Sequence, residues 1–410
     1  MRKSFTFLAS IFVLALSMSI SIMAQQTAGD IQGTVTDPNG AVVPGAGITV
    51  TGIDVGFSRK VQSDSNGYYR VTQVPAGRYK VDIAAVQGFT AQTKENVQVG
   101  LNNTTTLDFA LGTSTTAVVD VTGEGVLVDA TDTKAQSNIS AREIDALPKG
   151  TGFTSLLKTT PSVRPEPLGG QFSINGSTGP ENSFIVDGQE TQNFATGMIN
   201  SNQDIPYQAV QEIQVKTSGF EAEFGGATGG VINAVTKSGS NSFHGEFGVN
   251  LNTPKLNAGP RPTYTLFTGL TAASGETVPG SGQGLEVLPQ NRDGGTNFYP
   301  TALLSGPIIK DKLWFFAIHS PRIVNEERTS TFIQGFGPSR GPRVFSPLLQ
   351  SLNADHTQTF NRKTTYNYSQ LRLDASPINS LRISSSFVWN PIVQSGNILG
   401  GSLVNGSPST

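Results

Sequence analysis

The stretch that decides the fold is Ala209 to Gly248, AVQEIQVKTSGFEAEFGGATGGVINAVTKSGSNSFHGEFG. Apolar and polar residues alternate around Ile213 and again after Phe243, and Val231 to Thr236 (VINAVT) is a second β-prone run between them. Period-two alternation predicts β-strands. The loop between the first two strands holds Gly225, Gly226, Gly229 and Gly230, and glycine permits positive φ and close backbone approach. The stretch is therefore predicted to be a tightly folded polar segment and not a linker.

Three motifs follow one another here: Glu212 to Val215 (EIQV), Phe224-Gly225, and Gly229 to Gly245 (GGVINAVTKSGSNSFHG). Together they resemble the end of the plug domain and the first barrel strand of TonB-dependent outer-membrane receptors. The branch is the Oar-like one, which carries an N-terminal carboxypeptidase-regulatory-like domain. The resemblance implies a plug–barrel junction with structural roles for Gly225, Gly226, Gly229, Gly230, Asn233, Lys237, Gly239 and His244.

The composition limits the function classes. The chain has 410 residues, no cysteine, a formal charge of -2 and 14% charged residues, against roughly 25% in soluble domains. This profile is typical of exported β-rich proteins. A near-neutral chain without a basic block gives no electrostatic argument for nucleic-acid binding. Without cysteine there is no disulfide, thiolate metal site or cysteine nucleophile, and we expect no cofactor and no metal.

The N-terminus, residues 1–24, is predicted to be a signal peptide. Arg2 and Lys3 precede an apolar stretch from Phe5 to Ile20, and cleavage is expected after Ala24. An uncleaved anchor helix is the alternative. No later segment approaches the ~20 apolar residues of a transmembrane helix. A membrane-spanning part must then be a β-barrel, and we expect the outer membrane of a Gram-negative cell.

Residues 27–112 predict a β-sandwich, because short alternating runs are separated by turn signals such as Asp37 to Gly40 and Asp64 to Gly67. Val43 to Ala46 and Val74 to Tyr79 resemble the carboxypeptidase-regulatory-like fold, a prealbumin- or immunoglobulin-like sandwich. Peptidase chemistry is not implied, because these residues contain no histidine to bind zinc. A turn is favoured over a calcium loop at Asp64. Tyr68, Tyr69 and Tyr79 are either sugar-stacking residues or half-buried strand aromatics.

Residues 113–125 are predicted to be a linker that contains a short β-prone run, Val118, Val119, Asp120, Val121 and Thr122. In the family such a run, the TonB box, adds a strand to the periplasmic partner TonB, and backbone pairing suits this task. The alternatives are that the run is the first strand of the plug, or that the box lies nearer the mature N-terminus.

Residues 126–242 predict an α+β plug domain. Ser140 to Glu143 is a capping box that opens a short helix, and Phe153, Leu156 and Leu157 have helical spacing. Leu147-Pro148 and Thr160 to Val163 match the family, whereas Gly152 stands where it usually has arginine. The carboxylates Asp187, Glu190, Glu221 and Glu223 have no catalytic partner in a recognisable arrangement. They are attributed to the polar surface that a plug needs, and no catalysis is expected.

Residues 243–410 predict the first strands of an antiparallel transmembrane barrel. Phe243, Phe247, Val249 and Leu251 alternate with polar residues, the apolar-out, polar-in pattern of outer-membrane strands. Leu303 to Ala317 (LLSGPIIKDKLWFFA) resembles a family barrel signature. Short turns are expected at 306–311 and 376–380, and long loops at 252–296 and 321–365.

Barrel closure requires about 22 strands in a plugged transporter, and about five are found. The expected fold class is thus mainly β: a sandwich, an α+β plug and an incomplete barrel of a fragment. The predicted function is the N-terminal part of a TonB-dependent receptor that transports an unidentified ligand. Expected partners are TonB, outer-membrane lipid and an external ligand, with glycan and peptide left open. The alternative is a secreted carbohydrate-binding or adhesion protein.

Overall fold

The computed structural model describes residues 28–86, 88–112, 135–166, 172–193, 195–200, 203–219, 224–256, 258, 263–267, 284–288, 294–331, 357–378 and 381–396. The predicted signal peptide and linker lie outside these ranges. Within them, no helix has the length and apolar character needed to cross a membrane. Strands dominate, which confirms the mainly β class.

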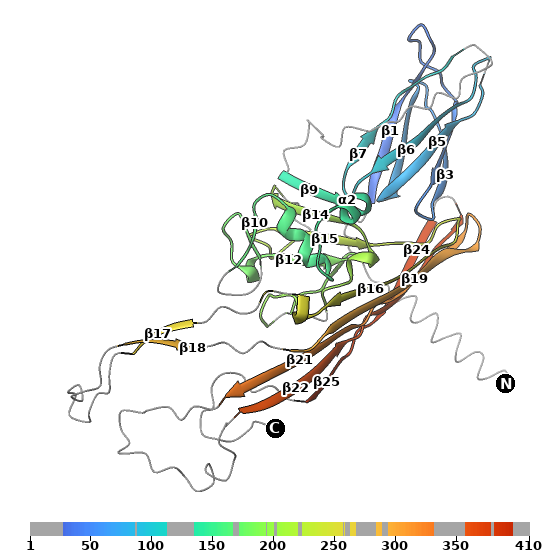
Figure 1. Cartoon of the computed structure of the whole chain (residues 1–410). Helices are drawn as coiled ribbons and strands as arrows, with labels where there is room; N and C mark the ends of the chain where they lie inside the picture. Colours follow the sequence, from blue (N-terminus) through green and yellow to red (C-terminus); the bar gives the residue numbers. More distant parts are fainter. Residues whose placement is uncertain are drawn as a thin grey trace, which may run out of the picture. The chain divides into compact units, whose positions relative to one another are not determined.

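The sandwich (28–112, blue in Figure 1) consists of two four-stranded sheets. One contains β4 (Tyr68–Pro75), β1 (Ala28–Thr36), β7 (Thr104–Thr106) and β8 (Phe109–Ala110); the other contains β3 (Ser58–Gln62), β2 (Gly47–Gly52), β5 (Gly77–Ile83) and β6 (Gln92–Val99). Alternate residues of both sheets form one apolar core, which includes the rings of Tyr69 and Tyr79. Of the three tyrosines considered for sugar stacking, only Tyr68 is exposed.

The plug (135–240) contains a five-stranded sheet in the order β13 (Gln189–Glu190), β12 (Ser183–Val186), β15 (Val231–Thr236), β14 (Val210–Ser218), β9 (Ala135–Ser140). Strands β12 and β15 are parallel, and the other pairs are antiparallel. Helix α2 (Ala141–Ala146) begins at the predicted capping box. The 3-10 helix η1 (Phe153–Thr159) buries Phe153, Leu156 and Leu157. Short elements complete the domain: β10 (Val163–Pro165), β11 (Phe172–Ile174), η2 (Gly179–Glu181) and η3 (Tyr207–Ala209).

The wall strands form an eight-stranded sheet, in orange to red in Figure 1 for all but β16. Its order is β24 (Leu381–Trp389), β23 (Ser369–Ile378), β20 (Leu313–His319), β19 (Asn297–Ile309), β21 (Arg322–Thr331), β22 (Thr357–Tyr366), β25 (Ile392–Gly396), with β16 (His244–Asn252) also paired to β19. Helix η4 (Pro254–Leu256) follows β16, and β17 (Thr263–Phe267) pairs with β18 (Gly284–Leu288).

Three details of the predicted barrel were wrong. Residues 306–309 continue β19, and the turn is 310–312, closed by the bond from Lys312 N to Ile309 O with Asp311 at positive φ. The segments predicted as long loops contain β17, β18, β21 and β22. Strands β21 and β22 are polar on both faces, so they give no period-two signal. The sheet has eight strands where about five were predicted, because β21, β22 and β25 were missed. Only two residues separate these strands from β20, β23 and β24, respectively.

Candidate functional site

Two of the predicted junction glycines lie where no side chain fits. A Cβ on Gly229 would stand 2.2 Å from Ser177 Oγ, and a Cβ on Gly230 would stand 2.7 Å from Ile174 Cδ1. Both glycines directly precede β15, so they let the backbone enter the sheet against β11 and its following turn. Their role in the structure is close packing inside the plug.

Gly225 and Gly226 occupy a different environment. Both are exposed, and among the described residues a Cβ on either would meet no atom within 4 Å. Gly226 has φ of +85°, a conformation that glycine adopts without strain. These two residues therefore shape a surface turn and do not pack against the plug interior.

The remaining predicted junction residues follow one another out of the plug. Asn233 is buried on β15, and within the described part of the chain its side-chain amide has no hydrogen-bond partner. Lys237 donates its backbone N–H to Ala209 O at 2.7 Å. Gly239 lies so close to β20 that a Cβ would stand 2.3 Å from Phe315 O. His244 is exposed, with Nδ1 3.0 Å from Ser242 O. The eight residues thus trace a path from plug to wall and do not converge on one site.

The side chains that do converge are Asp187, Thr236 and Arg372. Asp187 follows β12 in a turn, where its two carboxylate oxygens accept hydrogen bonds from the N–H and hydroxyl of Thr236 at 2.9 and 2.6 Å. Arg372 on β23 donates through Nη1 to Asp187 Oδ1 at 3.2 Å and to Thr236 O at 2.9 Å. The end of the plug sheet is thereby joined to the wall by charge-assisted bonds, which are stronger than neutral ones.

A second carboxylate, which is buried, holds the arginine in place. Asp374 is fully buried, and its oxygens accept bonds from Arg372 Nε at 2.9 Å, Arg382 Nη2 at 3.0 Å and Ser384 Oγ at 2.6 Å. Two guanidinium groups thus face two carboxylates, which balances the charge. We name Asp187, Thr236, Arg372, Asp374 and Arg382 the junction cluster.

The junction cluster was not predicted, although a signal for it exists. Along β23 the polar Gln370, Arg372 and Asp374 alternate with Leu371 and Leu373, as expected for a strand with one polar face. That this face meets the Val-Asp-Gly turn at Asp187 can be seen only in the folded structure, because the two segments lie far apart in the sequence.

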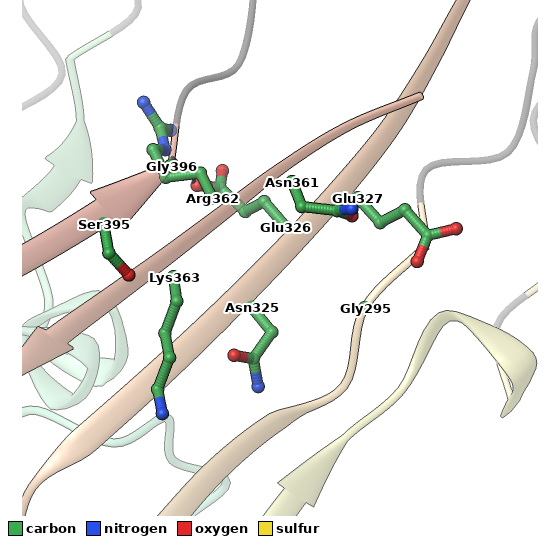
Figure 2. A pocket seen from close by; sticks show the side chains of 9 residues that line it. All are labelled: Gly295, Asn325, Glu326, Glu327, Asn361, Arg362, Lys363, Ser395 and Gly396. Atoms are coloured by element: carbon green, nitrogen blue, oxygen red, sulfur yellow. Dashed lines mark hydrogen bonds and ion pairs between the residues drawn. The ribbon is translucent and has the colours of Figure 1, made fainter. Parts of the chain in front are cut away.

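Two other parts of the chain were considered as binding sites: the predicted TonB box and a recess on the wall strands. The TonB-box residues Val118 to Thr122 lie outside the described residues, so their role stays a prediction. A recess of about 320 Å³ lies on β21, β22 and β25, and Figure 2 shows the residues that line it. Two of the charged groups that line it are paired with each other, with Arg362 Nε 2.6 Å from Glu326 Oε2. The recess forms beside Gly295 and Gly396, both at positive φ.

Comparisons with known proteins agree with this architecture. Residues 30–112 match the carboxypeptidase regulatory-like domain, and residues 129–231 match the TonB-dependent receptor plug domain. The TonB-dependent transporter Oar of Myxococcus xanthus is 34% identical over 322 residues, 76% of this chain and 27% of the transporter. This chain belongs to the TonB-dependent receptor family. The ferrienterobactin receptor of Escherichia coli K12 is 30% identical over 141 residues, 29% of this chain and 18% of that receptor.

Among solved structures, the siderophore receptor PirA from Pseudomonas aeruginosa has 17% sequence identity and a TM-score of 0.33, covering 64% of this chain and 42% of PirA. This TonB-dependent receptor chain spans 27% and 18% of the length of the two curated relatives. Its homologues are transporters and receptors, not enzymes. They are outer-membrane proteins whose plug faces the periplasm, which confirms the predicted location.

Proposed function

We propose that this chain forms the sandwich, the plug and the first wall strands of a receptor that transports an external ligand across the outer membrane. The observation that carries the proposal is the bond between Arg372 of the wall and Asp187 of the plug. A plug held by polar contacts can exchange them for water as it moves. Energy would come from TonB in the periplasm, and no step in this chain is catalytic.

The exposed apolar rows on the wall strands support a membrane location. Phe247 on β16 is 79% exposed and Phe387 on β24 is 67% exposed. Rows of exposed aromatic and aliphatic residues are expected where strands face lipid, whereas soluble proteins rarely expose large apolar patches. The alternative, a secreted adhesion or carbohydrate-binding protein, gives no reason for these rows.

The proposed contact with TonB is strand addition at Val118 to Thr122. Because the chain has no cysteine, single cysteines introduced along this run are the only thiols available for crosslinking to a cysteine in TonB. We expect a crosslink at alternate positions, since one face of an added strand lies against the partner. A complete absence of crosslinks along the run would remove it as the TonB box.

The ligand class is proposed to be a glycan or a peptide. The transport proposal itself is tested by reading the gene beyond the codon of Thr410. Fifteen or more further alternating strands would support it, since a plugged barrel needs about 22 strands. A stop codon at that point would contradict a working transporter.

A further inference from the structure

The sandwich is bound to the plug through the loop Gly100 to Asn103. Leu101 donates its backbone N–H to Glu212 Oε1 at 2.9 Å and accepts a bond from Gln214 Nε2 at 2.8 Å on its carbonyl. Asn138 donates to the same Glu212 oxygen at 2.7 Å. The buried side chain of Leu101 packs with Val235 of the plug. This first contact combines buried hydrogen bonds with apolar packing.

A second contact joins the sandwich to the place where plug becomes wall. Gly56 donates its N–H to Gly239 O at 2.6 Å, and its carbonyl accepts a bond from Arg382. The indole of Trp314 lies against Gly56 so closely that a Cβ there would stand 2.3 Å from the ring. Trp314 is itself fixed, because its Nε1 donates to Asn241 Oδ1 at 2.8 Å.

Arg382 connects this second contact to the junction cluster. One of its nitrogens donates to Gly56 O and another donates to Asp374 Oδ1, and Asp374 in turn binds Arg372, the partner of Asp187. A chain of hydrogen bonds therefore runs from the sandwich through the wall to the plug. The Leu101 contact closes this chain into a ring.

We propose that the sandwich is a strap that holds the plug closed against the wall strands. Because one end is bound to the plug sheet and the other to the wall, the plug cannot separate from β20 and β24 while both contacts remain. This proposal rests on the proposed function in one respect, namely that the plug moves away from the wall during transport. The experiment measures only how firmly the plug is held in the closed state. A negative result would therefore count against the strap and not against transport.

The two contacts can be broken from the sandwich side alone, because each contains a glycine. A Cβ on Gly56 meets the Trp314 ring, and a Cβ on Gly100 stands 3.2 Å from Glu212 Oε1. Neither glycine has φ in the left-handed region. The variants are G56V, G100V and the double variant. The matched control is G112V, since among the described residues a Cβ on Gly112 meets only Thr90 Oγ1, at 3.9 Å.

The measurement is hydrogen–deuterium exchange of the whole 410-residue chain in detergent micelles. Reporter peptides cover residues 231–236 in the plug and 369–378 in the wall. We expect G56V and G100V each to speed exchange about tenfold, the factor for 1.4 kcal/mol, and G112V to leave it unchanged. Since a strap needs both ends, the double variant should exchange no faster than the faster single variant.

If the increase in exchange rate in the double variant equals the product of the two single increases, the contacts act independently and the strap is overturned. Exchange at the wild-type rate in both single variants would overturn it as well. Exchange in residues 77–83 reports whether the sandwich itself stays folded. If valine at position 56 unfolds it, G56A replaces G56V, because its single Cβ already clashes with the ring. The comparison is then the same: the strap requires that the double variant exchange no faster than the faster single variant.

Discussion

Arg372 and Asp187 are 185 residues apart in sequence, and their side chains meet at 3.2 Å between Nη1 and Oδ1. Arg372 is largely buried and also pairs with Asp374. This pair ties the end of the plug sheet to the third-last wall strand of the described chain, β23. The contact is thus made by groups that water can also satisfy, as the proposed movement of the plug requires.

Arg372→Leu should destabilise the plug–wall arrangement strongly. The substitution leaves two carboxylates near one remaining guanidinium, and breaking a buried pair from one side costs about 3–5 kcal/mol. The free energy of unfolding from urea titration in detergent measures the effect. The control is Arg78→Leu, whose partner Asp54 is at the surface, where such pairs contribute about 0–1 kcal/mol. Equal losses in both variants would contradict the assignment.

Stability should fall as pH rises from about 4.5 to about 7. Burial raises the pKa of Glu212 from 4.5 to about 7, while the bonds from Leu101 and Asn138 lower it and Glu143 raises it further. The folded chain therefore binds the Glu212 proton more tightly than the unfolded chain. The contribution is fully present below pH 4.5 and is lost above the folded pKa. It is at most about 3 kcal/mol, at 1.36 kcal/mol per pKa unit.

Glu212→Gln removes this titration and provides the check. The variant keeps an oxygen that can accept from Leu101 and Asn138. We expect the difference in unfolding free energy between wild type and variant to change across pH 4.5 to 7 and to be constant above it. Parallel pH profiles for the two proteins would show that Glu212 titrates alike in the folded and unfolded chain.

Gly229→Ala and Gly225→Ala should behave in opposite ways. Alanine at 229 forces its Cβ against Ser177 Oγ, whereas alanine at 225 meets open space without a left-handed φ. Overpacking costs about 1–3 kcal/mol, and a compatible glycine-to-alanine change stabilises by about 0.4–1 kcal/mol. Thermal unfolding of the two variants beside the wild type tests the pair. A tolerated alanine at 229 would show that β11 yields without strain.

Asn233→Leu should be neutral or stabilising. The amide of Asn233 is buried, and within the described residues both of its polar atoms are unpaired. An unpaired buried polar group costs about 1–3 kcal/mol, which an apolar residue of similar shape avoids. Urea unfolding gives the sign. A clear loss of stability would mean that a buried water satisfies the amide.

Local patterns in the sequence were sufficient for several elements of the sandwich and plug. The capping box at Ser140 opens α2, the alternation around Ile213 gives β14, and the mostly apolar run after Val231 gives β15. Each of these signals comes from neighbours in the chain, such as a side chain that caps its own helix or one face of one strand. They were therefore visible without tertiary information.

The same patterns failed where a strand has no apolar face. Strands β21 and β22 were predicted as loops because Asn325, Glu326, Arg362 and Lys363 occupy both faces. Their formation depends on pairing with each other over ten residue pairs. Backbone hydrogen bonds between strands do not depend on side-chain type, so a polar strand shows no alternation of apolar and polar residues from which it could be predicted.

By itself the sequence indicated the family and the succession of sandwich and plug, and it singled out Gly229, Gly239 and His244, because glycine-rich motifs and period-two alternation are local. Only the tertiary structure decided which charged and polar groups come into contact. Arg372 reaches Asp187, Arg382 reaches Gly56, and Leu101 reaches Glu212. These contacts join segments more than 100 residues apart, and ion pairs and hydrogen bonds of this kind are set by where the folded backbone places each group.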